Sequence, residues 1–361
     1  MRTMAIMKLR FVVCALVVGA LVACNKKKEE PKADPAVQEP KPDQAMKPKE
    51  PPPVDPVQRG SYIAEAAGCL TCHTGMAGGG PDLANAGAGG LEMPDPAGTW
   101  RTPNITPDKA SGIGNWTDDQ IMRAVREGVR PDGSQLYVIM PYQNFNRMTD
   151  DDAKALVAFL RTLKPVERVV APNGKDLKFP KIPMGKPANQ PDVTTDPVKH
   201  GEYLATLMLC THCHWTPDAK MAPAGPDKMY SGGLDMTIPM FGTGKLYAPN
   251  ITSDPETGIG KWKEDEIFTV IRTMVKPNSK MISPPMLLLQ GGWSQMDEKD
   301  LHAVAAFIHQ LPPVKNKVPD STFQFKPPGP PPAAGSGAGS AAPMKKDEPK
   351  TTPKKGAAKK G

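Results

Sequence analysis

Two cysteine–histidine motifs carry the residue types best suited to chemistry in this chain of 361 residues. Both follow the pattern Cys-x-x-Cys-His. At this spacing each cysteine can form a thioether with one of the two vinyl groups of a haem, and the following histidine can ligate the iron. The pattern therefore predicts two covalently bound haem c groups. The residues involved are Cys69, Cys72 and His73 in the first motif and Cys210, Cys213 and His214 in the second.

Other interpretations of these cysteines explain less of the pattern. A four-cysteine zinc site would have to join two motifs from separate units, and it would leave both histidines unused. Two local disulfides are chemically possible outside the cytoplasm, but they give the histidines no reason to repeat. A thioredoxin-like redox pair calls for a flanking β-α-β pattern, which the sequence does not show. The haem hypothesis accounts for every position of the motif.

The segment before the last predicted helix of each unit supplies a candidate sixth iron ligand. Met140 and Met286 occupy equivalent positions there, and a thioether is a soft ligand that favours reduced iron. Met281 is an alternative to Met286. Met148 and Met296 also align between the units, but each directly precedes a helix start and is expected to pack in the core. Met140 and Met286 are therefore the predicted distal ligands.

Each unit also contains a Pro-Asn-Ile-Thr turn, beginning at Pro103 and at Pro249. A backbone carbonyl of such a turn can accept the N–H of the haem-ligating imidazole and so select the histidine tautomer. A proline that only shapes its loop is an equally good interpretation. On the first interpretation, Pro103 and Pro249 belong to the predicted cofactor-binding residues.

These motifs recur because the chain repeats itself: residues 58–166 and 199–314 share one succession of short motifs. Each copy is expected to be a cytochrome-sized domain of its own, since two copies are too few for a solenoid. Apolar residues at helical spacing follow a capping box at Thr117 and a second helix start at Thr149. No segment shows sustained strand alternation. The sequence predicts an all-α fold of two tandem domains, joined by the proline-rich linker 167–198.

The N-terminal residues have the composition of an export signal. Positive residues precede an apolar run that ends at Leu-Val-Ala-Cys24, which is typical of a bacterial lipobox. We expect 1–23 to be a lipoprotein signal peptide, Cys24 to carry lipid, and the proline- and lysine-rich residues 24–57 to be a disordered tether. The alternative is an ordinary secretory signal with Cys24 as a bystander. The sequence thus predicts a periplasm-facing protein that is lipid-anchored to a bacterial membrane.

The formal charge of +7 is concentrated in the terminal segments, and the region between them is nearly neutral. Nucleic acid is therefore not an expected partner. Residues 315–361, rich in proline, glycine and lysine, are expected to be a disordered tail. Every apolar run falls short of the ~20 residues that a spanning helix requires, so the predicted membrane contact is the lipid anchor.

Taken together, these motifs resemble the cytochrome c superfamily, and more closely the multihaem cytochrome subunits of periplasmic alcohol and aldehyde dehydrogenases. The resemblance implies a haem-c fold with His/Met iron in each copy. Those subunits usually carry three haem motifs, whereas this chain has two, and their anchor is commonly C-terminal, whereas this C-terminus is polar. The segments that carry the resemblance are 69–73, 102–108, 112–117, 140–142 and 158–163.

The leading functional hypothesis is a dihaem cytochrome that transfers electrons between redox partners outside the cytoplasmic membrane and does no substrate chemistry of its own. A dehydrogenase, another cytochrome or a terminal oxidase are the partner classes that the resemblance implies. The alternative is a peroxidase-like dihaem enzyme with one open or displaceable iron site. A thiosulfate-oxidising enzyme would need a cysteine ligand, and none is left once Cys24 is acylated and Cys14 is removed with the signal.

Overall fold

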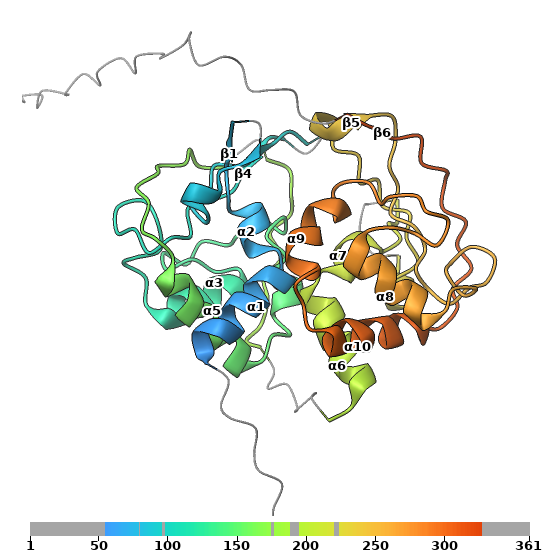
Figure 1. Cartoon of the computed structure of the whole chain (residues 1–361). Helices are drawn as coiled ribbons and strands as arrows, with labels where there is room; N and C mark the ends of the chain where they lie inside the picture. Colours follow the sequence, from blue (N-terminus) through green and yellow to red (C-terminus); the bar gives the residue numbers. More distant parts are fainter. Residues whose placement is uncertain are drawn as a thin grey trace, which may run out of the picture. The chain divides into compact units, whose positions relative to one another are not determined.

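The computed structural model describes most of the predicted globular region (Figure 1). The predicted signal peptide, Cys24 and nearly all of the tether lie outside the described residues, as does the chain beyond 326. None of the described helices is long and apolar enough to cross a membrane. The described ranges are 55–78, 80–95, 98–174, 177–187, 195–219 and 224–326.

The first repeat is built on helices whose starts are set by local capping. The Thr117 hydroxyl accepts a hydrogen bond from the backbone N–H of Gln120, and the Gln120 side chain in turn accepts one from the backbone N–H of Thr117, so the predicted capping box is confirmed. At the start of the last helix, the Thr149 hydroxyl accepts a hydrogen bond from the backbone N–H of Asp152. The helices of this repeat are α1 (Pro56–Ala66), α2 (Cys69–Cys72), α3 (Asp118–Glu127), α4 (Tyr142–Phe145) and α5 (Asp150–Thr162), with a 3-10 turn η1 (Leu83–Asn85).

The second repeat presents the same order of elements. Its first helix starts at a proline preceded by Asp196, which caps it, just as Asp55 caps α1. The helices are α6 (Pro197–Leu207), α7 (Cys210–Cys213), α8 (Glu264–Thr273), α9 (Gln290–Trp293) and α10 (Glu298–His309), with 3-10 turns η2 (Pro226–Lys228), η3 (Pro239–Phe241) and η4 (Met286–Leu289).

Three two-stranded antiparallel ladders tie the long loops, so the described chain is mostly α rather than all-α as predicted. Each strand has two residues, which is too short to produce the alternation by which a strand is found in a sequence. The paired strands are β1 (Met76–Ala77) with β2 (Gly80–Pro81), β3 (Glu92–Met93) with β4 (Trp100–Arg101), and β5 (Gly242–Thr243) with β6 (Gln324–Phe325).

In each repeat the first helix packs tightly on the last, α1 on α5 and α6 on α10 (Figure 1). A glycine makes the close crossing possible. A Cβ added at Gly60 would lie 1.9 Å from the Ala155 carbonyl oxygen, and one at Gly201 would lie 1.9 Å from that of Ala303. Buried apolar side chains of both repeats form one contiguous cluster around these crossings. The repeated glycine is therefore a packing residue.

The boundaries of the repeats differ from the predicted ones. Part of the predicted linker packs on the first repeat: Arg168 forms a 2.7 Å ion pair with Asp82, and the Asn173 side chain accepts a 2.7 Å hydrogen bond from the backbone of Arg101. The first helix begins at Pro56, two residues before the predicted start. These proline-rich residues lack periodicity, but their polar groups pair with loops of the domain.

The prediction of a disordered tail over 315–361 is wrong for residues 315–326. Within 315–326 the Asn316 side chain donates a 2.8 Å hydrogen bond to the Ser231 carbonyl oxygen. The Thr322 backbone N–H donates a 2.8 Å hydrogen bond to the Lys245 carbonyl oxygen. Strand β6 then pairs with β5. Composition indicated disorder here because proline and lysine form no apolar stripe, whereas the segment is ordered by backbone pairing with distant loops.

Candidate haem sites

The two Cys-x-x-Cys-His motifs have nearly the same backbone. Each forms one helical turn, α2 or α7, that is entered through a left-handed residue, Gly68 at φ 65° and Leu209 at φ 64°. The backbone N–H of His73 donates 2.9 Å to the Cys69 carbonyl, and His214 makes the same bond to Cys210. Because residues three apart on a helical turn share a face, both cysteines of each motif are directed to one side.

The four motif cysteines form no disulfide with one another or with any other described residue. Burial raises the pKa of Cys69 to about 12 and that of Cys210 to about 12, so both are protonated at neutral pH. Among the described residues no three His, Cys, Asp or Glu side chains converge into a metal cluster, so the zinc site considered above is not assembled there. The donor chemistry that remains, two thiols and an imidazole on one turn, fits the vinyl groups and iron of a haem.

The motif histidines are buried and oriented by a backbone carbonyl. The Nδ1 of His73 donates 2.9 Å to the Pro103 carbonyl oxygen, and that of His214 donates 2.8 Å to the Pro249 carbonyl oxygen. Burial lowers the pKa of both histidines, so the imidazoles are neutral at pH 7. With the proton on Nδ1, the Nε2 lone pair is free, and no described residue bonds to it. This is the tautomer that an iron ligand needs.

A hydrogen-bonded asparagine holds each Pro-Asn-Ile-Thr turn in place. The Asn104 side chain accepts 2.9 Å from the Thr106 backbone and donates 2.7 Å to the Val166 carbonyl oxygen, after the last helix. The residues of the same network in the second repeat are Asn250, Thr252 and Val314. Sequence reasoning gave these asparagines no role, although their repetition was the available signal.

Two glycines allow the proline carbonyl to approach the histidine. Gly89 (φ +68°) and Gly232 (φ +72°) donate 2.8 Å to the carbonyl oxygens of His73 and His214. An added Cβ would lie 2.4 Å from the carbonyl carbon of Pro103 or of Pro249. Only glycine tolerates both the positive φ and this contact. The repeated Gly-Gly-Leu motif thus belongs to the support of the histidines, which sequence reasoning did not recognise.

The structure separates the aligned methionines by burial. Met148 and Met296 are 0% and 3% exposed in the core, which confirms that they pack. Met140 and Met286 are half-buried and contact the edge of the same cluster, whereas Met281 is 64% exposed. No described contact tests which methionine ligates an iron, so Met140 and Met286 stay predictions, and exposure makes Met281 the weaker alternative.

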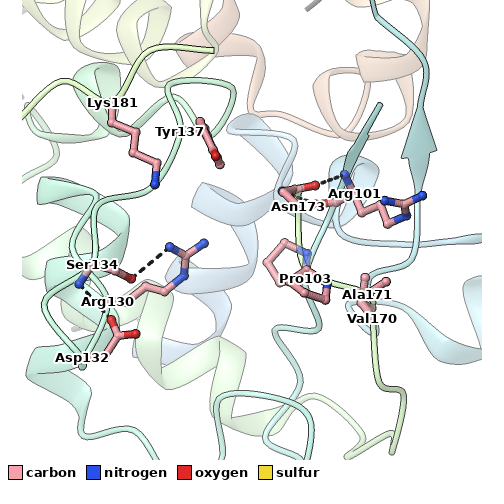
Figure 2. A pocket seen from close by; sticks show the side chains of 11 residues that line it. Arg101, Pro103, Arg130, Asp132, Ser134, Tyr137, Val170, Ala171, Asn173 and Lys181 are labelled. Atoms are coloured by element: carbon pink, nitrogen blue, oxygen red, sulfur yellow. Dashed lines mark hydrogen bonds between the residues drawn. The ribbon is translucent and has the colours of Figure 1, made fainter. Parts of the chain in front are cut away.

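A basic cavity of about 390 Å³ lies next to the Pro103 turn (Figure 2). The Arg130 guanidinium donates 3.3 Å to the Ser134 hydroxyl, and burial lowers the pKa of Arg130 while Asp132 opposes that shift. The Lys181 ammonium lies 4.5 Å from the centre of the Tyr137 ring. Arg101 also lines the wall, but its guanidinium is paired with Glu92 at 2.7 Å, so Arg130 and Lys181 are the cations left beside Asp132 to attract an anionic group. These residues come from separate segments, and the sequence gave no sign that they converge.

Comparison with known proteins matches residues 57–164 to the family described as "Cytochrome c". The chain is 34% identical to the fructose dehydrogenase cytochrome subunit of Gluconobacter japonicus, over 71% of this chain and 52% of the relative. It is 35% identical to the cytochrome c subunit of the quinone alcohol dehydrogenase of Gluconacetobacter polyoxogenes, over 72% and 56%. A "Diheme cytochrome c-type" protein of Cereibacter sphaeroides is 29% identical over 71% and 86%. The chain spans about half the length of the first two relatives.

Proposed function

We propose that the chain is a member of the cytochrome c family and transfers electrons with two haem c groups, one on each repeat. The observation that carries the proposal is the duplication of the histidine support: Pro103 and Pro249 accept from His73 and His214 at 2.9 and 2.8 Å. A diheme relative supports the same count. A chain with one working motif would have no physical reason to keep this geometry twice.

Each group of residues has a separate task toward the haem. The cysteine pairs would hold the macrocycle through thioethers, and the histidine Nε2 atoms would ligate the iron. The proline carbonyls hold the histidine proton on Nδ1, which fixes the ring orientation and raises the basicity of the ligand. A bound haem c supplies a reversible one-electron couple. The polypeptide therefore needs no acid, base or nucleophile for this function.

We assign the distal positions to Met140 and Met286. Both methionines lie before the last helix of their repeat, and both are half-buried. A thioether ligand raises the potential of the iron that it binds. The basic cavity beside Pro103 is assigned to the carboxylate groups of the first haem, since Arg130 and Lys181 could offer charge-assisted hydrogen bonds there.

The relatives support a proposal for the redox partner of this protein, and the N-terminal sequence supports one for its place in the cell. The relatives are named as cytochrome subunits of dehydrogenases, so we propose a periplasmic dehydrogenase as the electron donor. Acylation of Cys24 would tether the protein to a membrane. Cys24→Ser should release a soluble form or block processing, and mass spectrometry that placed the mature N-terminus downstream of Cys24 would contradict the anchor.

The haem count is tested by removing one attachment cysteine at a time. Cys72→Ala and Cys213→Ala should each lose one of two haem equivalents in a pyridine haemochrome assay, because a single thioether holds the haem poorly. Haem staining after denaturing electrophoresis checks that the remaining group is covalent. Retention of two equivalents in either variant, or one equivalent in the parent chain, would contradict the proposal.

A further inference from the structure

The segment that follows each predicted distal methionine docks on the other repeat, directly beside its haem-attachment turn. From the first repeat, the Asn144 side chain on α4 donates two hydrogen bonds. One of 3.2 Å goes to the Thr206 carbonyl oxygen near the end of α6, and one of 2.8 Å goes to the Thr211 hydroxyl inside α7. From the second repeat, the indole N–H of Trp293 on α9 donates 3.0 Å to the Ala66 carbonyl at the end of α1. The docking is therefore reciprocal.

The α9 segment also approaches the backbone of the first repeat closely. Gly292 on α9 occupies the position equivalent to Asn144, and a Cβ added there would lie 2.5 Å from the Glu65 carbonyl oxygen. A Cβ added at Gly68, which precedes Cys69, would lie 2.7 Å from the Leu289 side chain. At Gly292 the neighbouring atoms are backbone, so a side chain there would force the two segments apart. The α9 segment thus contacts the backbone that leads into the first attachment turn.

A pair of tyrosine–carboxylate bonds crosses the same interface. The Tyr62 hydroxyl of the first repeat donates 2.5 Å to Asp300 of the second, and the Tyr203 hydroxyl of the second donates 2.6 Å to Asp152 of the first. Tyr62 and Tyr203 are equivalent in the two copies, as are the two aspartates. Contacts that map onto themselves when the partners are exchanged define an approximate two-fold interface.

Each carboxylate at this interface is also bound by a cation or imidazole of its own repeat. Asp152 accepts 2.6 and 2.9 Å hydrogen bonds from Arg59. Asp300 lies 2.8 Å from His200 Nε2, in the position equivalent to Arg59. Both carboxylates are buried, at 6% and 9% exposure, so each crossing bond is made away from water. Losing one would leave a buried acceptor short of a partner.

We propose that the reciprocal docking of α4 and α9 is a positioning device that holds the two haem-attachment turns, α2 and α7, and the groups bound to them, at one fixed separation. This inference rests on the proposed function, because it needs a haem on each motif. Two haems held there would supply one-electron exchange within one chain, and the contacts of α4 and α9 would set the distance between them.

Two neighbouring glycines of α9 supply a matched test in the haem-loaded protein. Gly292→Leu must push α9 off the Glu65 carbonyl, whereas Gly291→Leu is the control, because a Cβ at Gly291 has no atom within 4 Å. Pulsed electron paramagnetic resonance of the oxidised protein measures the magnetic dipolar coupling between the two irons. We expect the parent and Gly291→Leu to share one sharp coupling, and Gly292→Leu to lose it or shift it to a longer separation.

A second pair of variants covers the case in which Gly292→Leu does not fold. The double variant Tyr62→Phe, Tyr203→Phe removes both crossing bonds, and each should shift the docked-to-open ratio toward open by about tenfold. Hydrogen exchange of the α2 and α7 amides then reports the opening. Tyr247→Phe is the control, since no described hydrogen bond involves the Tyr247 hydroxyl.

The outcomes separate this inference from the proposed function. A parent chain with one haem equivalent would overturn both. Two haems with no defined coupling in the parent, or a Gly292→Leu coupling equal to that of the parent, would overturn the positioning role alone. Equal losses in Gly292→Leu and Gly291→Leu would also overturn it, because the effect would then belong to α9 and not to its contact with α1.

Discussion

Gly89→Ala should displace the carbonyl group that holds His73 while leaving the Cys-x-x-Cys-His motif unchanged. Gly89 has a φ of +68°, and a Cβ there would lie 2.4 Å from the carbonyl carbon of Pro103 and 2.5 Å from its oxygen. A side-chain carbon this close to backbone atoms must push the turn away. The 2.9 Å hydrogen bond from His73 to Pro103 is then lost.

Two contributions set the expected loss of stability. Alanine in the left-handed region costs about 1–2 kcal/mol, and loss of a buried hydrogen bond adds about 1 kcal/mol. Gly78→Ala is the matched control, because Gly78 has a φ of +62° but no atom within 4 Å of an added Cβ. The control carries only the first contribution. Gly89→Ala should therefore unfold at least roughly 2–4 °C below the control, the shift that about 1 kcal/mol produces.

Thermal unfolding of the haem-loaded protein, followed by circular dichroism, measures the difference. A redox titration gives the functional consequence: an imidazole that loses its carbonyl partner is a weaker base, so the potential of the first haem should rise in Gly89→Ala and not in Gly78→Ala. Equal melting temperatures and equal potentials for the two variants would refute the argument that Gly89 supports the histidine through the Pro103 carbonyl.

Three further predictions concern the second iron, the basic cavity and the interface. Met286→Ala should let the reduced protein bind carbon monoxide, seen as a shifted Soret band, while Met281→Ala should not; the reverse result would exchange the two assignments. Arg130→Gln should lower the potential of the first haem in a redox titration, because a half-buried positive charge disfavours oxidised iron. Arg123→Gln is the control: Arg123 pairs with Glu127 on the surface of α3, so its loss should leave the potential unchanged. Burial acts to raise the pKa of Asp300, but hydrogen bonds from its neighbours outweigh it and hold the pKa below the usual value. A carboxylate with a depressed folded pKa contributes stability above the unfolded pKa of about 3.9, and this contribution is lost as pH falls through the folded pKa. Asp300→Asn should therefore cost about 2 kcal/mol at pH 7, and the cost should shrink as the pH is lowered below about 3.9, as measured by urea unfolding.

Local patterns were enough to predict the chemistry of the sites. The spacing from Cys69 to His73 is a property of one helical turn, and the capping box at Thr117 involves residues three apart, so neither depends on distant parts of the chain. A carbonyl acceptor for the imidazole was one of two equal interpretations of the recurring Pro103 turn, and the Pro103 carbonyl does accept from His73. The recurrence at Pro249 made the two halves predictable together.

Only the tertiary structure decided how the two copies meet. The bond from Tyr62 to Asp300 joins residues that are far apart in sequence, and the basic cavity gathers Arg101, Arg130 and Lys181 from three loops. Such contacts depend on the angle and depth at which helices pack, which no local periodicity encodes. Residues 315–326 are ordered for the same reason, since backbone pairing with remote loops leaves no mark on composition.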